Sequence, residues 1–173
     1  MTTSGEATTS GVASSGESTA TEPAVEQAVV GVGSRVMGDD GVGFHAVERL
    51  QDRSLPGGVT ATHAGTTAFL ALEAMSGADR AVVVDALALD DDPGTIREFR
   101  LHDAPEEAPE VTMHDFSFTD ALAVGDAAYD LPEEVLLVGV VPERLEPSLE
   151  LSETVAAALP DLVSRIETRL DTA

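Results

Sequence analysis

Two short runs of this chain are apolar at almost every position, and they constrain its fold more than any other feature. Ala81–Asp85 reads AVVVD and Glu134–Val141 reads EVLLVGVV. A strand that faces solvent on one side alternates apolar and polar residues, whereas a strand covered on both faces is apolar throughout. Both runs are far shorter than the roughly 20 residues that a membrane-spanning helix needs. They therefore predict central strands of a sheet enclosed between two layers of helices.

Strand and helix patterns alternate through the rest of the chain. The further predicted strands are Ala28–Gly33, Val59–Ala64 and an edge strand, Thr95–Leu101. The predicted helices are Gly41–Gln51, Thr66–Met75, Asp115–Val124 and a last helix that begins after Ser152. Alternation of this kind is typical of a mostly parallel α/β sheet.

Residues 1–26 differ in composition from the rest of the chain. They are rich in Ser, Thr, Gly, Ala and Glu and contain no aromatic residue. Such a segment buries too little apolar surface to offset the entropy cost of ordering. We predict an acidic, disordered tail over residues 1–26 and one α/β domain over residues 27–173. The opening sequence MTTSGEATTS lacks the basic and apolar parts of a secretory signal, so we expect a cytoplasmic protein.

The charge balance of the chain is strongly acidic. The sequence has 32 acidic and 9 basic residues, a net charge of −23, and every basic residue is Arg. Such a surface repels itself unless salt screens it, which favours a halophilic protein over a merely acidic mesophilic one. The same charge argues against nucleic acid as a partner. The absence of Cys excludes thiol nucleophiles and zinc–thiolate sites, and the absence of Lys excludes Schiff-base chemistry.

Three polar side chains are predicted at the edge where the parallel strands end. Asp40 follows the first strand and its Gly-rich loop, Asp85 ends the third strand, and His114 precedes a helix. Ligands of open α/β sheets bind beyond the carboxyl ends of the strands. Two carboxylates and an imidazole suit Zn, Ni, Fe or Mn and leave positions open for water or substrate. Taken alone, the three residues are weak evidence for a metal site, because they lack a local spacing such as His-Glu-x-x-His.

Each of these residues also has a purely structural explanation. Asp40 is placed to cap the following helix, and His114 is placed as a helix-start residue or as an exposed loop histidine. When Asp40 and His114 are each considered alone, these structural explanations are favoured over metal binding. Asp85 is more informative, because an acid after four apolar strand residues is costly to bury unless it is paired or ligated. The loop at Gly31 begins like a dinucleotide-binding fingerprint, but Val36 occupies the place of its third glycine.

Several segments resemble one known family. VVGVGSRVMGDDGVGFHAVERL (Val29–Leu50) resembles that family's opening strand, Gly-rich loop and acid pair, and Gly65-Thr66 resembles its Gly-Thr turn. VVVDA (Val82–Ala86) is similar to the strand whose Asp is a metal ligand, and LVGVVPERLEPSLELSETV (Leu137–Val155) to the last strand and helix start. The segment around His114 resembles the family's histidine segment. The family is that of the nickel–iron hydrogenase maturation proteases.

The resemblance implies both a fold and an activity. The implied fold is a phosphorylase/hydrolase-like three-layer αβα sandwich with a mostly parallel five-stranded sheet and one antiparallel edge strand. The implied activity is that of an endopeptidase that removes the C-terminal extension of a nickel–iron hydrogenase large-subunit precursor after nickel insertion. Asp40, Asp85 and His114 would contact nickel supplied by the precursor, for which Zn or Cd would substitute in vitro. Asp40 and Asp85 would also be the catalytic acids, and we expect a monomer that binds no membrane.

The chain departs from the family pattern at three places, one of which is Arg35, a charged residue at a loop position that is often apolar. Ser34 stands where the family usually has Asn, and His63 stands where an acid or Gly is more usual. Two other functions fit parts of the sequence. A phospho-receiver-like signalling domain also has an acid pair after its first strand, but here Arg144 follows the last strand in place of a Lys. A non-catalytic metal-binding relative would carry the same ligands. The sequence does not separate a metal-bound attacking water from one activated by an acid.

Overall fold

A five-stranded sheet forms the centre of the fold in the computed structural model, which describes residues 26–101, 112–113 and 116–171. Its strands are β1 (Gln27–Gly31), β2 (Val59–His63), β3 (Arg80–Ala86), β4 (Ile96–Arg100) and β7 (Glu134–Val140). They lie in the order β2-β1-β3-β7-β4. The first four strands of that order run parallel, and β4 pairs antiparallel with β7 at one edge. The predicted sheet, with its antiparallel edge strand, is confirmed.

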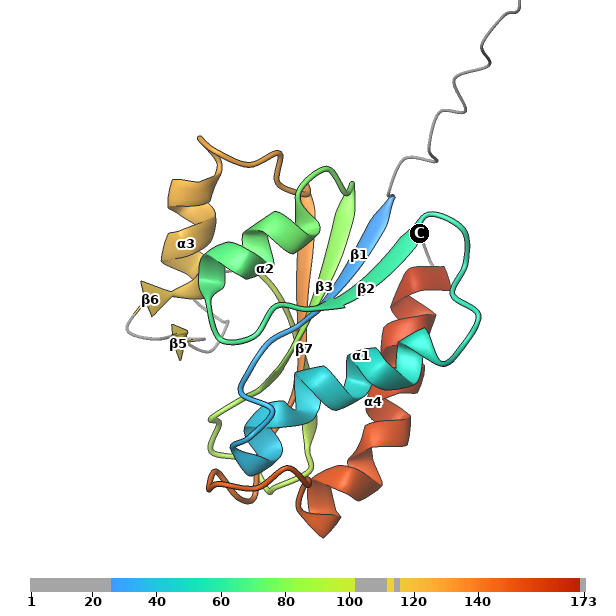
Figure 1. Cartoon of the computed structure of the whole chain (residues 1–173), viewed down its shortest axis with the longest axis vertical. Helices are drawn as coiled ribbons and strands as arrows, with labels where there is room; N and C mark the ends of the chain where they lie inside the picture. Colours follow the sequence, from blue (N-terminus) through green and yellow to red (C-terminus); the bar gives the residue numbers. More distant parts are fainter. Residues whose placement is uncertain (1–25, 102–111, 114–115, 172–173) are drawn as a thin grey trace, which may run out of the picture.

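Helices cover both faces of the sheet (Figure 1). They are α1 (Val42–Gln51), preceded by the 3₁₀ helix η1 (Gly38–Gly41), α2 (Ala68–Met75), α3 (Phe118–Gly125) and α4 (Glu153–Asp171). Helices α1 and α4 pack on one face, and α2 and α3 pack on the other. This arrangement is the predicted three-layer αβα sandwich. Within the described part of the chain, no helix has the length and apolar character that crossing a lipid bilayer requires.

The central strands are apolar throughout because successive residues face opposite helix layers. In β3, Ala81 and Val83 pack towards α2 and α3, whereas Val82 and Val84 pack towards α1 and α4. Full burial of a valine side chain stabilises the fold by roughly 1.5–3 kcal/mol. Two separate cores therefore form, one on each face of the same sheet.

Two glycines let the first helix start directly against the end of the sheet. A Cβ atom on Gly43 would lie 2.4 Å from the Val32 carbonyl oxygen and 2.6 Å from the Val84 carbonyl oxygen. A Cβ atom on Gly31 would lie 2.3 Å from the Gly43 carbonyl oxygen. Any larger residue at either position would push α1 outwards. The start of α1 is thereby held at the edge where β1 and β3 end.

The structure differs from the predicted elements mainly around α3. The predicted helix Asp115–Val124 begins only at Phe118, because β6 (Phe116–Ser117) pairs antiparallel with β5 (Thr112–Met113). β5 and β6 have two residues each, which is too short for the alternation of apolar and polar residues that predicts a strand. The sequence therefore predicted only the helix in this segment. The predicted tail lies outside the described residues except for Glu26, whose backbone N–H donates to the Gly58 carbonyl oxygen at 2.9 Å.

Candidate active site

The strand order places a topological switch point between β1 and β3. From β1 the chain crosses through α1 to β2 on one side, whereas β3 has β7 as its other neighbour. At such a switch point the connections diverge and leave a crevice outside the carboxyl ends of the two strands. Asp40 lies in η1, directly after the β1 loop, and Asp85 lies one residue before the end of β3. Both predicted acids are therefore placed at the switch point.

The loop that precedes Asp40 holds its carboxylate. Its Oδ2 accepts a hydrogen bond from the Ser34 N–H at 2.6 Å. Gly33 has a φ of +107°, and a Cβ atom there would lie 2.0 Å from the Asp40 carbonyl oxygen, so this turn requires glycine. The N-cap residues of η1 and α1 are Met37 and Gly41, and neither helix has a side-chain cap. The capping explanation for Asp40 is therefore wrong.

Asp85 is a buried carboxyl group beside a second one. Its Oδ1 accepts a hydrogen bond from the Ala86 N–H at 2.8 Å. Burial, followed by the negative charge of Asp40, raises the pKa of Asp85 to about 8, and the Ala86 bond opposes that rise only in part. Among the described residues, no arginine contributes to this pKa. Two neighbouring acids with no cation to offset them fit a divalent metal ion, which would favour ionisation of both.

The third predicted ligand, His114, lies outside the described residues. In the part of the chain that the structure describes, no group of three His, Asp or Glu side chains is arranged to hold a metal ion. The structure thus brings Asp40 and Asp85 together at the switch point. Completion of the set by His114 stays a prediction.

Asp39 has a different role from its neighbour Asp40. Its side chain is fully buried and accepts four hydrogen bonds. The donors are the N–H groups of Glu143 (2.9 Å), Arg144 (2.8 Å) and Ser152 (2.7 Å) and the Ser152 hydroxyl (2.9 Å). Burial acts to raise the pKa of Asp39, but these bonds outweigh it and hold the pKa below its ordinary value. Asp39 therefore ties η1 to the loop after β7, a role that the acid pair alone did not reveal.

His63 is a further residue at this edge of the sheet. Its Nε2 lies 3.0 Å from the Gly33 carbonyl oxygen, and its ring packs edge-on against Phe44 with centroids 5.3 Å apart. The Arg35 guanidinium lies 4.6 Å from the centroid of the same Phe44 ring. His63 also borders an open groove of about 490 Å³ lined by Thr62, His63, Ala64, Gly65, Leu70, Glu73 and Ala74. Sequence reasoning noted His63 only as a departure from the family pattern.

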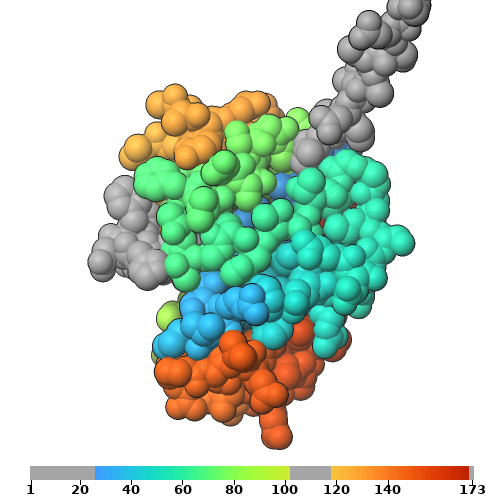
Figure 2. Space-filling view, in the orientation of Figure 1, coloured from blue at the N-terminus to red at the C-terminus, as the bar shows by residue number. Residues whose placement is uncertain are grey.

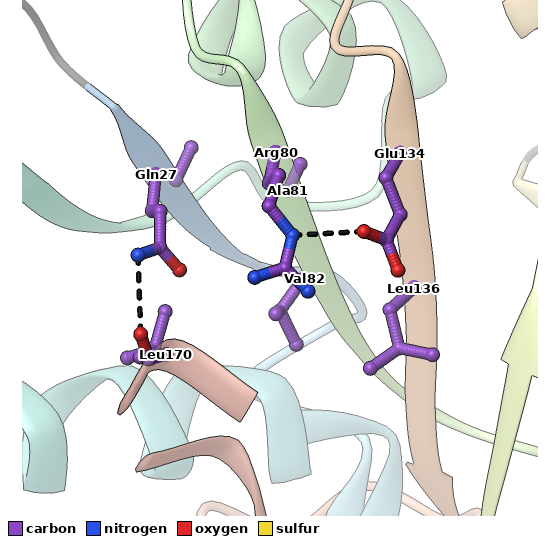
Figure 3. A pocket seen from close by; sticks show the side chains of 8 residues that line it. Gln27, Arg80, Ala81, Val82, Glu134, Leu136 and Leu170 are labelled. Atoms are coloured by element: carbon purple, nitrogen blue, oxygen red, sulfur yellow. Dashed lines mark hydrogen bonds and ion pairs between the residues drawn. The ribbon is translucent and has the colours of Figure 1, made fainter. Parts of the chain in front are cut away.

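A small pocket at the opposite end of the sheet offers no comparable chemistry (Figure 3). It lies among the first residues of β1, β3 and β7, and its volume of about 10 Å³ holds about one water molecule. Its polar groups already bind one another or the backbone. Arg80 Nε donates to Glu134 at 2.9 Å, and Gln27 Nε2 donates to the Leu170 carbonyl oxygen at 3.1 Å.

Comparisons with known proteins agree with this geometry. A family model described as hydrogenase maturation protease matches residues 44–169. The chain belongs to the hydrogenase maturation protease family. The matched segment includes Asp85 and begins just after Asp40. The family resemblance predicted from the motifs is confirmed, and so is the peptide-hydrolase class. This membership disfavours the alternative of a phospho-receiver-like domain. The antiparallel edge strand β4 also fits that alternative poorly.

Individual relatives extend the match over most of the chain. The hydrogenase 2 maturation protease of Escherichia coli K12 is 30% identical over 141 residues, covering 80% of this chain and 86% of that protein. The hydrogenase expression/formation protein HoxM of Azotobacter vinelandii is 33% identical over 121 residues, which cover 68% of this chain and 58% of HoxM. This chain thus spans less than two thirds of HoxM. The hydrogenase maturating endopeptidase HybD of E. coli has the same fold, with a TM-score of 0.75 at 29% identity over 85% of this chain and 93% of that one.

The buried carboxyl group of Asp85 predicts a pH-dependent stability in the metal-free protein. The pKa of Asp85 is about 8 in the folded state against an ordinary 3.8, so the folded state binds its proton more tightly. Its contribution is complete below pH 3.8 and is lost as the pH rises through 8, which amounts to roughly 3 kcal/mol between pH 6 and 9. Urea unfolding with a chelator measures this loss. Asp85→Asn should lack it, and equal declines in both proteins would contradict the assignment.

Proposed function

We propose that this protein is an endopeptidase that removes the C-terminal extension of a nickel–iron hydrogenase large-subunit precursor after nickel insertion. The observation that carries the proposal is the convergence of Asp40 and Asp85 at the β1–β3 switch point of a maturation-protease fold. In this proposal nickel arrives as part of the substrate. Asp40, Asp85 and His114 bind it, so that the protein cuts only a loaded precursor.

Within the described residues, each of the two carboxyl groups uses one oxygen as a hydrogen-bond acceptor. Asp40 uses Oδ2 to accept the Ser34 N–H, and Asp85 uses Oδ1 to accept the Ala86 N–H. Each can bind a cation through its other oxygen. When bound, a divalent cation supplies Lewis-acid chemistry at the scissile carbonyl. Peptide hydrolysis also needs a group that takes a proton from the attacking water, and we assign that step to Asp40 or Asp85.

Intact-mass spectrometry of a purified precursor tests the proposed function. Incubation of nickel-loaded precursor with this protein should release one C-terminal peptide. Nickel-free precursor with the protein, and loaded precursor without it, should both keep their full mass. The experiment needs high salt and a parallel circular dichroism spectrum to show that the protein is folded. If the loaded precursor bound the folded protein but stayed intact, the protein would instead be a non-catalytic relative. If the precursor neither bound nor was cut, it would not be the substrate of this protein.

We further infer that the protein works as a monomer in a salt-loaded cytoplasm, because its charge is so one-sided. Much of the surface arginine is already paired with acids, as in Arg53–Glu167 and Arg169–Glu98, both at 2.6 Å. The remaining acids repel one another, and salt screens that repulsion. Raising KCl from 0.1 to 2 M should stabilise the fold by roughly 2–4 kcal/mol, measured as a rise in melting temperature of about 5–15 °C. An unchanged or lower melting temperature would contradict the halophilic interpretation.

A further inference from the structure

The peptide group between Gly33 and Ser34 is hydrogen-bonded at both of its ends. Its carbonyl oxygen, on Gly33, lies 3.0 Å from His63 Nε2. Its N–H, on Ser34, donates to Asp40 Oδ2 at 2.6 Å. A single rigid peptide plane therefore connects an imidazole at the end of β2 with the carboxylate at the switch point.

The direction of these two bonds is fixed by chemistry. A carbonyl oxygen only accepts, so His63 Nε2 must carry the hydrogen that it donates. A donor on the carbonyl polarises the amide, which strengthens the N–H as a donor to the carboxylate. The His63 bond thus acts on Asp40 in two ways: it orients the peptide plane, and it strengthens the bond that fixes the carboxylate.

Backbone contacts alone do not fix the orientation of this peptide. The Gly33 N–H donates to the Gly65 carbonyl oxygen at 2.9 Å. This bond ties the loop after β1 to the loop after β2, but it involves the peptide group that precedes the Gly33–Ser34 peptide. Gly33 itself has a φ of +107° and no side chain that could restrict the next plane. In the described residues, His63 is the side chain bonded to the Gly33 carbonyl oxygen.

We infer that His63 is a positioning residue, which orients the Asp40 carboxylate for metal binding through the Gly33–Ser34 peptide. The inference rests on the proposed function in taking Asp40 as a metal-binding group. Residues that hydrogen-bond directly to a metal-binding group typically change metal affinity or activity by 10–100-fold when they are mutated. His63 acts one peptide further away, so we expect an effect near the lower end of that range.

His45 provides a matched control for the packing role of His63. Both rings contact Phe44 edge-on, with centroid distances of 5.3 Å for His63 and 5.4 Å for His45. The His45 side chain forms its polar contact with Glu48, at 3.8 Å, and within the described part of the chain it makes no bond to the loop at Gly33. His45→Leu and His63→Leu therefore remove the same kind of aromatic contact, but only the second removes the donor to Gly33. His63 borders the open groove, so substitutions there have room.

The test has two readouts on the full chain in high salt. In metal-free protein, NMR hydrogen exchange of the Ser34 amide should be at least about 10-fold faster in His63→Leu than in wild type. Calorimetric titration with Ni²⁺ alone should show affinity at least about 10-fold weaker in His63→Leu. His45→Leu should match wild type in both. His63→Gln, whose amide N–H can take the place of Nε2–H, should recover most of both effects.

The outcomes separate this inference from the proposed function. Unchanged Ser34 exchange in His63→Leu would overturn the inference, as would wild-type Ni²⁺ affinity together with fast exchange. Equal losses in His63→Gln and His63→Leu, or equal losses in His45→Leu, would indicate packing and not positioning. If wild type bound no Ni²⁺, the metal part of the proposed function would fail, and the claim that His63 orients Asp40 for a metal would fail with it. The Ser34 exchange would still report whether His63 fixes the peptide.

Discussion

Asp85→Asn is expected to reduce cleavage of a nickel-loaded precursor by at least about 1,000-fold while leaving the protein folded. The pKa of Asp85 is about 8 in the metal-free protein, so at neutral pH this buried group mostly holds its proton. Asparagine has the same shape as the protonated acid and should preserve the packing at the end of β3. It cannot ionise, however, so it supplies neither an anionic ligand nor a base. The measurement is the rate of precursor cleavage followed by intact mass.

Two further variants complete that experiment. Asp40→Asn should cause a similar loss of cleavage, because it removes the other carboxylate of the pair. Asp126→Asn, which changes an exposed acid after α3, should cleave at the wild-type rate and controls for the loss of one surface charge. Near-normal cleavage by a folded Asp85→Asn protein would contradict the assignment of this residue to the active site.

Asp39→Ala is expected to lower the free energy of unfolding by about 3–5 kcal/mol, the largest stability effect of any single substitution that we predict. The substitution leaves the buried N–H of Ser152 and the partly buried N–H groups of Glu143 and Arg144 without their acceptor. Each unsatisfied buried donor costs about 1–3 kcal/mol. The loop after β7 and the start of α4 would keep only backbone bonds to η1, such as the one from the Gly38 N–H to the Ser148 carbonyl oxygen at 2.9 Å. Urea unfolding at fixed high salt measures the change.

The adjacent acid provides the matched comparison for that prediction. Asp40→Ala removes one hydrogen bond, from the Ser34 N–H, and also removes the negative charge that adds to the effect of burial in raising the pKa of Asp85. Its effect on stability should therefore be small, about 1 kcal/mol or less in either direction. Cleavage should be lost in Asp40→Ala even though the protein stays stable. Equal destabilisation by the two substitutions would contradict the division of roles between these neighbours.

The acid pair shows where sequence reasoning stops. In a 3₁₀ helix, successive residues point about 120° apart, so adjacent side chains cannot enter the same environment. One acid of the pair had to face the interior, and nothing local shows which. The choice depends on donors from the loop after β7 and from Ser152, more than 100 positions away in the sequence. His63 is a similar case, because its bond to Gly33 joins the ends of two different strands.

The sequence by itself determined the sandwich, the strand-helix alternation, the family and the two acids at the sheet edge. Apolar runs, helical periodicity and short motifs are local properties, and a parallel sheet places the ends of its strands on one edge. The tertiary structure alone decided that Asp39 is structural, that Asp40 is not a helix cap, and that one peptide joins His63 to Asp40. These outcomes depend on hydrogen bonds between distant segments, which form only when the sheet and its helices bring those segments together.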